Sequence, residues 1–165
     1  MGQKFIINGN AELYSSHGPI SASQIYQAFL SKKLTSDFKI AGFGPQGKEL
    51  PGTIKNMIEL TSQRGYLMKV SGVGLQSDFL IFYPGQTFLY ASGIPISIDD
   101  IRPSDLLVAL NGMLSVDFVN SLDLEDKTQI FYEIEFTSPM ETIYANNLVI
   151  YPIEVGESKN PFFIE

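Results

Sequence analysis

Residues 42–49 form the most specific chemical pattern in the sequence, a glycine-rich stretch of the kind that can bind phosphate. The stretch reads Gly42-Phe43-Gly44-Pro45-Gln46-Gly47-Lys48-Glu49. It matches the dinucleotide pattern G-x-G-x-x-G and nearly matches the phosphate-binding pattern G-x-x-x-x-G-K-[S/T]. Both patterns need a following helix whose N-terminus faces the phosphates, and Pro51-Gly52 comes too soon for such a helix. Glu49 also places a negative charge where a hydroxyl belongs. We therefore predict an exposed loop that binds no nucleotide and no other cofactor.

The remaining candidates for catalysis or metal binding are one histidine and several carboxylates. His17 lies in a Gly-Pro turn, and the sequence contains neither a G-x-S-x-G nor an H-E-x-x-H motif. Paired carboxylates could serve a glycosidase, and oxygen ligands could hold calcium. The carboxylates here lack the spacing of an EF-hand, so we interpret them as solvated acidic turns. The sequence predicts no catalytic, cofactor-binding or metal-binding residue; the carboxylates considered are Asp99, Asp100, Asp123, Glu125, Asp126, Glu133 and Glu135.

The composition favours a single globular domain. The chain has 165 residues, of which 44% are hydrophobic and 18% charged, so it is too apolar for intrinsic disorder. Its net charge of -7 argues against nucleic acid as a partner, because phosphates are usually met by clustered Lys and Arg. The absence of Cys excludes disulfides, thiolate metal sites and a cysteine nucleophile.

Neither a signal peptide nor a membrane span is expected. Residues 1–9 contain only three consecutive apolar residues, too few for a secretory signal. Residues 79–98 carry no charge, but Pro84-Gly85-Gln86 interrupts them. A spanning helix would lose backbone hydrogen bonds there that lipid cannot replace, so two short strands around a turn explain the stretch better.

Three turn signals, each between two apolar runs, predict a chain rich in short strands. Asn8-Gly9 and Asn111-Gly112 suit two-residue hairpins, and Pro84-Gly85 suits a type II turn. Apolar and polar residues alternate over 114–118 and over 130–136, as in strands with one buried face. Residues 148–155 form another β-rich run, which Pro152 confines to a sheet edge or a bulge.

One segment is typical of an α-helix. Ser21 and Gln24 have the spacing of a capping box, and Ile20 and Ile25 can form a hydrophobic staple around it. We expect the helix to end near Lys33. Residues 104–110 are ambiguous: the Asn-Gly hairpin is favoured, and a short helix is the alternative.

Together these elements predict a mainly β fold, an antiparallel β-sandwich or barrel with one short α-helix in its N-terminal half. We assign residues 1–155 to a single β-rich domain and residues 156–165 to a C-terminal hinge with an apolar arm. The strand–helix alternation that a parallel sheet would need is missing.

The segment from Asp105 to Phe118, an apolar strand, the Asn-Gly turn and a second apolar strand, is followed by the strand that begins near Thr128. In this order the segment resembles bacteriophage tail and fibre modules. The gap between Val119 and Lys127 is longer than in that pattern. The resemblance implies a virion structural protein that works by assembly and has no catalytic residues.

We therefore expect a non-enzymatic virion subunit of a tail, baseplate or capsid, whose partners are copies of itself and other structural subunits, with neither nucleic acid nor membrane bound. Its location would be the virion, or otherwise the cytoplasm. Two alternatives are a monomeric carbohydrate- or receptor-binding sandwich and a hydrolase with a carboxylate pair.

The apolar C-terminal arm is the expected assembly contact. Its large side chains would forgo about 1.5–3 kcal/mol each if left in water, so they should be buried. Docking on a neighbouring subunit is favoured slightly over packing on the arm's own sandwich; the arm residues are Pro161, Phe162, Phe163 and Ile164.

Overall fold

The described part of the chain forms two antiparallel sheets and one α-helix. A computed structural model describes residues 2–72, 75–110, 112–123 and 129–155. The C-terminal arm, including Pro161, Phe162, Phe163 and Ile164, lies outside the described residues. The strands are β1 (Gly2–Asn8), β2 (Glu12–Ser15), β3 (Gly18–Ser21), β4 (Gly42–Phe43), β5 (Ile54–Ser62), β6 (Arg64–Gly72), β7 (Leu75–Phe82), β8 (Thr87–Leu89), β9 (Pro95–Ser97), β10 (Leu106–Ala109), β11 (Gly112–Asp123), β12 (Gln129–Phe136), β13 (Thr142–Ala145), β14 (Leu148–Ile150) and β15 (Ile153–Val155), with α1 over Ala22–Leu30.

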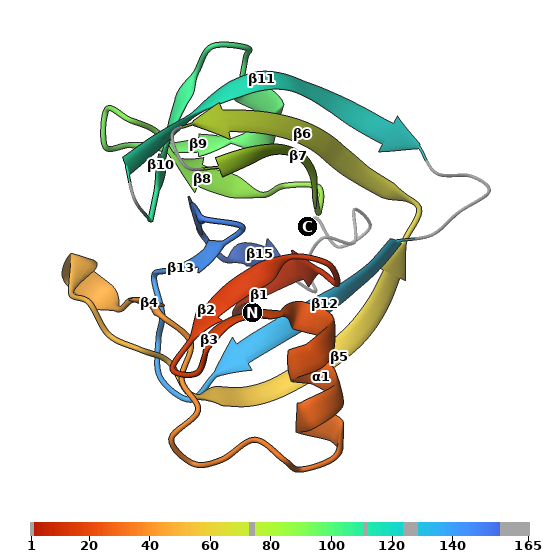
Figure 1. Ribbon diagram of the computed structural model, residues 1–165, viewed down its shortest axis with the longest axis vertical. Helices are drawn as coiled ribbons and strands as arrows, with labels where there is room; N and C mark the ends of the chain where they lie inside the picture. Colours follow the sequence, from red (N-terminus) through yellow and green to blue (C-terminus); the bar gives the residue numbers. More distant parts are fainter. Residues whose placement is uncertain (1, 73–74, 111, 124–128, 156–165) are drawn as a thin grey trace, which may run out of the picture.

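The smaller sheet has four strands in the order β15-β1-β12-β5. The larger sheet follows the path β3-β2-β13-β14-β10-β11-β6-β7, to which β4, β8 and β9 are attached. Both sheets are open, and every strand pair in them is antiparallel. Figure 1 shows β6, β7 and β11 above β1, β5 and β12, with α1 beside the lower strands. The predicted mainly β, antiparallel fold with one short helix is confirmed.

One main core joins the two sheets and the helix. Its buried side chains come from both sheets and from α1 and include Leu13, Ile25, Met68, Phe88 and Ile134, all fully buried. Such burial of aliphatic and aromatic surface is the main force that holds short strands of this kind together.

The helix follows its local sequence signals. Ser21 is the N-cap, its hydroxyl oxygen accepts a hydrogen bond from the Gln24 N–H, and the Gln24 side chain accepts one from the Ser21 N–H. Ile25 is fully buried and Ile20 packs partly buried against the same core. The capping box is confirmed, and the helix ends at Leu30, three residues before the predicted end.

The Asn8-Gly9 hairpin prediction was wrong. β1 pairs with β12 and β15, whereas β2 pairs with β3 and β13, so the chain changes sheet at this turn. The Gly9 N–H donates to the Ile130 carbonyl, 121 residues away, and long-range pairing of this kind overrides a local turn preference. Pro84-Gly85 does form a turn, with Gly85 at φ +90°, but β8 then pairs with β9 and β14 rather than with β7.

The hairpin of β10 and β11 is confirmed, and the helical alternative for residues 104–110 is excluded, because Leu106 lies opposite Ser115 and Ala109 opposite Gly112. The expected Asn111-Gly112 loop is not confirmed, since Gly112 is already the first residue of β11 and pairs with Ala109. Asn111 lies outside the described residues. Residues 148–155 also behave as predicted, because Pro152 separates β14 from β15 and β15 is an edge strand. Among the described residues, we find no helix with the length and hydropathy required to span a membrane.

We predict that Gly112→Val destabilises the protein by more than about 1 kcal/mol, because Gly112 has φ +128° and a β-branched residue is strained there. A Cβ at this position would meet nothing within 4 Å, so the cost comes from the backbone alone. Met113→Val, at the exposed neighbouring position, is the control and should be nearly neutral in urea unfolding. Equal midpoints for the two variants would contradict the backbone explanation.

Candidate functional site

The glycine-rich stretch 42–49 lies at the edge of the larger sheet. Gly42 and Phe43 form β4, Pro45–Gly47 form one 3-10 turn, and the next strand or helix along the chain is β5. The helix that a phosphate cradle requires does not follow the glycines. Gly42 has a structural role instead, because a Cβ on it would lie 2.3 Å from the Thr142 backbone oxygen of β13.

The single histidine and the candidate carboxylates have separate contacts of their own. His17 is exposed in the turn between β2 and β3, where its ring stacks on Phe38 at 5.7 Å. Asp99 accepts a hydrogen bond from the Tyr66 hydroxyl. Within the described ranges, no group of three His, Cys, Asp or Glu side chains could hold a metal ion.

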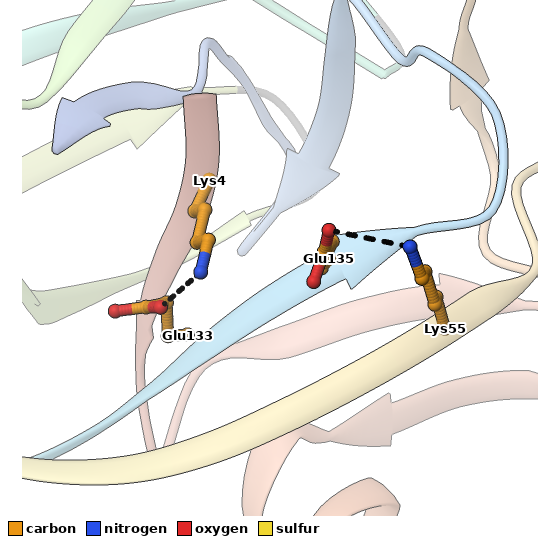
Figure 2. A network of polar contacts seen from close by, with 4 residues as sticks. All are labelled: Lys4, Lys55, Glu133 and Glu135. Atoms are coloured by element: carbon orange, nitrogen blue, oxygen red, sulfur yellow. Dashed lines mark ion pairs between the residues drawn. The ribbon is translucent and has the colours of Figure 1, made fainter. Parts of the chain in front are cut away.

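Glu133 and Glu135 each form an ion pair with a lysine of a neighbouring strand (Figure 2). Lys4 of β1 lies 2.9 Å from Glu133, and Lys55 of β5 lies 3.8 Å from Glu135. The two glutamates therefore bind cations of their own sheet rather than forming a carboxylate pair across a cleft.

A second buried region lies on the face of the smaller sheet that carries these ion pairs. Ile6 and Phe131 are 3% and 0% exposed, yet neither belongs to the main core. Ile6 lies opposite Glu133, and Phe131 is two residues before Glu133, so all three side chains share one face. We call this region the central junction; it comprises Ile6, Tyr83, Gln86, Phe131, Tyr151 and Ile153.

The larger sheet covers this face with the turn after β7. The Tyr83 ring packs edge-on against Phe131, with centroids 5.2 Å apart. Gly85 approaches Ile153, whose Cγ2 would lie 3.9 Å from a Cβ on that glycine. In Figure 1 β15 lies next to β1, between the lower strands and β7. The central junction thus joins the two sheets beside β1 and β15, the first and the last of the described strands.

Gln86 is the buried polar side chain of the central junction, and it is 1% exposed. Its Nε2 donates to the Thr87 carbonyl at 2.8 Å and to the Tyr151 carbonyl at 2.9 Å. The Tyr151 N–H in turn donates to the Thr87 carbonyl. Gln86 therefore fixes the backbone directly before Pro152 and β15. Burial, followed by the negative charge of Glu141, raises the pKa of Tyr151, so this phenol stays protonated at neutral pH.

Both ends of the described chain meet at one edge of the smaller sheet. β1 and β15 are antiparallel neighbours, with Gly2 opposite Val155 and Lys4 opposite Ile153. Residues directly opposite in such a pair have Cα atoms about 4.5–5.5 Å apart. The described chain therefore begins and ends side by side.

The ion pair of Lys4 with Glu133 lies directly beside these ends. The hydrogen bond from Lys4 to Glu133, followed by the charge of that carboxylate, raises the pKa of Lys4 above its ordinary value of 10.5. A raised lysine pKa means that the folded state binds the proton more tightly than the unfolded state. The stabilisation is complete below pH 10.5 and is lost as the pH rises through the folded-state pKa.

We predict that Lys4→Met lowers the free energy of unfolding at neutral pH by up to about 1 kcal/mol, the upper end for partly exposed pairs. Lys55→Met is the control and should cost less, because its side chain is 61% exposed and its pair is longer. The difference between wild type and Lys4→Met should shrink above pH 10.5 in urea unfolding. A difference that stays constant through alkaline pH would contradict this role for the pair.

A cavity of about 470 Å³ opens where β12 ends. Phe5, Ile134 and Met140 form its buried floor, and the exposed residues Thr137, Ser138 and Pro139 form its rim. Glu135 and Phe136 complete the lining.

Solved structures of inteins match this chain over about nine-tenths of its length. The intein-like domain from Clostridium thermocellum is 12% identical, with a TM-score of 0.65, covering 92% of this chain and 99% of its own. The DnaB intein from Synechocystis sp. PCC 6803 is 11% identical, with a TM-score of 0.64, covering 91% of this chain and 99% of its own. The TvoVMA intein is 14% identical, with a TM-score of 0.64, covering 91% and 98%. No protein-family model and no curated protein sequence matches the chain. The chain therefore has the intein fold.

These similarities correct the functional expectations from sequence. The resemblance to phage tail and fibre modules was wrong, because it rested on one hairpin, a local feature that unrelated β folds share. The virion subunit, the carbohydrate-binding sandwich and the carboxylate hydrolase are likewise not supported. The expectation of a non-enzymatic structural subunit is overturned as well, because the solved structures that the chain resembles are inteins.

Sequence analysis identified the turn at Pro84-Gly85 but missed Gln86 and Tyr151. They are 65 residues apart, and neither belongs to a recognisable motif. Their contact depends on the order of strands in two sheets, which a single sequence does not reveal.

Proposed function

We propose that this chain is an intein-type processing domain that acts on polypeptide segments joined to its own two ends. The observation that carries the proposal is the pairing of β1 with β15, which sets Gly2 opposite Val155. Joining two flanking segments requires both to be held close together, and a folded domain that holds them so removes the entropic cost of their encounter. The intein fold supports the same activity.

The composition limits the chemistry of such a reaction. With no Cys in these 165 residues, any nucleophile that they themselves supply must be an oxygen or a nitrogen rather than a thiolate. The buried polar side chain of the central junction is the carboxamide of Gln86, which is neither a thiol nor an imidazole. Processing therefore has to be tested directly rather than argued from a motif.

The test is a fusion in which small folded proteins of different mass precede residue 1 and follow residue 165. Intact-mass spectrometry after expression and after incubation over a range of pH and temperature would identify the products. Flanks joined to each other would be splicing, and flanks released separately would be cleavage; either product supports the proposal. A precursor that stays intact throughout would overturn it and leave the domain a role in holding its flanks together.

A destabilised variant separates autoprocessing from cleavage by host proteases. Gly42→Ala, which is expected to disturb the pairing of β4 with β13, should lower the yield of products that arise from the folded domain. Products that persist undiminished or increase in this variant would come from proteolysis and would count against the proposal.

A further inference from the structure

We propose that a cavity beside the C-terminal end of α1 binds a small carboxylate with an aromatic tail. The cavity has a volume of about 280 Å³ and is lined by the end of α1, the segment that follows it and the start of β5 (Figure 1). All of its lining residues belong to the described part of the chain. The inference goes beyond the proposed processing activity and does not depend on it.

The interior of this cavity is apolar and aromatic. Phe29 and Leu34 are half-buried, Phe38 is 6% exposed, and Ile54 packs against the main core. The Phe38 ring stacks on His17, with centroids 5.7 Å apart, so a neighbouring ring holds it in place. A further aromatic ring in the cavity would pack against aromatic side chains, which favour offset and edge-on contacts.

The volume of the cavity limits the size of its ligand. An engineered cavity of ~150 Å³ binds one benzene, and this cavity is roughly twice as large. It is slightly smaller than the pockets that enclose drug-sized molecules, which begin at about 300 Å³. A space of this size accommodates one phenyl ring with a short alkyl linker.

A positive charge lies at the edge of this apolar space. Lys32 is exposed and lines the cavity, whereas its exposed neighbour Lys33 does not. The segment 32–39 contains three lysines and one aspartate, in a chain whose net charge is -7. An ammonium group beside an apolar cavity is complementary to a carboxylate with an apolar tail, because the tail can be buried while the two charges stay hydrated.

The backbone at Lys32 supports a role for its side chain. α1 ends in a Schellman motif, in which the Lys33 N–H donates to the Ala28 carbonyl at 2.8 Å and the Lys32 N–H to the Phe29 carbonyl at 3.1 Å. Lys32 takes the left-handed position of this motif, with φ +57°, where glycine is the usual residue. Either lysine suits the negative end of the helix dipole. A long charged side chain kept at the strained position indicates a functional constraint on that side chain.

A hydroxyl group provides a second polar contact inside the lining. Thr53 Oγ1 accepts a hydrogen bond from Lys39 Nζ at 2.7 Å. A hydroxyl that accepts in this way keeps its own O–H to donate, and the adjacent ammonium strengthens that donor. The other hydroxyl of the lining, that of Thr35, donates to Asp37. Lys32 and Thr53 are therefore the groups that we expect to bind the carboxylate.

Titration of the 165-residue protein with hydrocinnamate, followed by two-dimensional amide NMR, tests the proposal. Hydrocinnamate is a phenyl ring joined to a carboxylate by a short alkyl linker. Saturable shifts are expected in the amides of the lining residues, with a Kd on the order of 1 mM for a ligand of this size. Hydrocinnamyl alcohol, which has the same tail but no charge, should bind more weakly.

Lys32→Met and Lys33→Met are a matched pair, because the two lysines are adjacent and both are exposed. Lys32→Met should weaken the binding of hydrocinnamate by about two- to fivefold, the range of a solvent-exposed ion pair. It should leave the binding of hydrocinnamyl alcohol unchanged. Lys33→Met should leave the binding of both compounds unchanged.

The absence of saturable shifts up to about 10 mM hydrocinnamate would overturn the proposal. Equal weakening by the two lysine substitutions would show a non-specific attraction to the basic segment and would overturn it as well. Shifts confined to residues away from the lining would place the ligand elsewhere, and equal affinity for the alcohol would remove the carboxylate from the account. None of these measurements depends on whether segments joined to the chain are processed.

Discussion

Gly42→Ala is expected to lower the free energy of unfolding by about 3 kcal/mol, at or beyond the upper end for overpacked sites. The new Cβ would lie 2.3 Å from the Thr142 carbonyl oxygen, 2.9 Å from the Met140 Cε and 3.0 Å from the Ile143 Cγ2. The first of these atoms is backbone in β13 and cannot rotate away. β4 would have to separate from β13, and the hydrogen bond from the Glu141 N–H, directly before β13, to the Phe43 carbonyl would weaken.

Gly44→Ala is the matched control for this substitution. Gly44 belongs to the same glycine-rich stretch, and a Cβ on it would meet the Leu50 Cδ2 at 2.9 Å. Leu50 is 40% exposed, so its side chain can move aside at little cost. In equilibrium urea unfolding, the free energy of unfolding of Gly42→Ala should therefore be well below that of Gly44→Ala and of wild type. If both variants were equally stable, close approach to β13 would not explain the glycine at position 42.

Gln86→Leu is expected to lower the free energy of unfolding by about 1–3 kcal/mol. The substitution removes the buried donor to the Tyr151 carbonyl while keeping a side chain of similar size. The Thr87 carbonyl keeps the hydrogen bond from the Tyr151 N–H, so the loss is concentrated at residue 151. Since β15 begins two residues later, its amides should exchange with solvent faster in the variant. Hydrogen exchange read by mass spectrometry would measure this over residues 153–155.

Thr87→Val is the control for Gln86→Leu, because Thr87 takes part in this contact through its carbonyl alone. It should leave both stability and the exchange of β15 nearly unchanged. If the β15 amides of Gln86→Leu exchanged as slowly as those of wild type, Gln86 would not be what fixes the backbone before β15.

Local signals in the sequence predicted local structure well. The capping box at Ser21 and Gln24 involves residues three apart, and the β10–β11 hairpin closes between Ala109 and Gly112. In both cases the groups that decide the conformation are neighbours in the chain. The Asn8-Gly9 turn failed for the opposite reason, since the partner of Gly9 is Ile130.

The sequence alone did not identify the fold. Its identity lies in the order β15-β1-β12-β5, which combines the first, last and middle parts of the chain. The intein structures that share this fold are only 10–14% identical to the chain. Without Cys, and with its one His in an exposed turn, the sequence carries no chemical pattern that points to a processing domain.

The central claim is that the domain holds its two ends side by side, and an interspin distance measures this directly. Because the chain lacks native Cys, nitroxide labels on the double variant Gln3→Cys and Glu154→Cys would mark two residues that lie opposite each other in β1 and β15. Strong dipolar broadening in the folded protein, lost in urea, is the predicted result. Narrow, unbroadened spectra from folded protein would show that the ends lie apart, and would contradict the account.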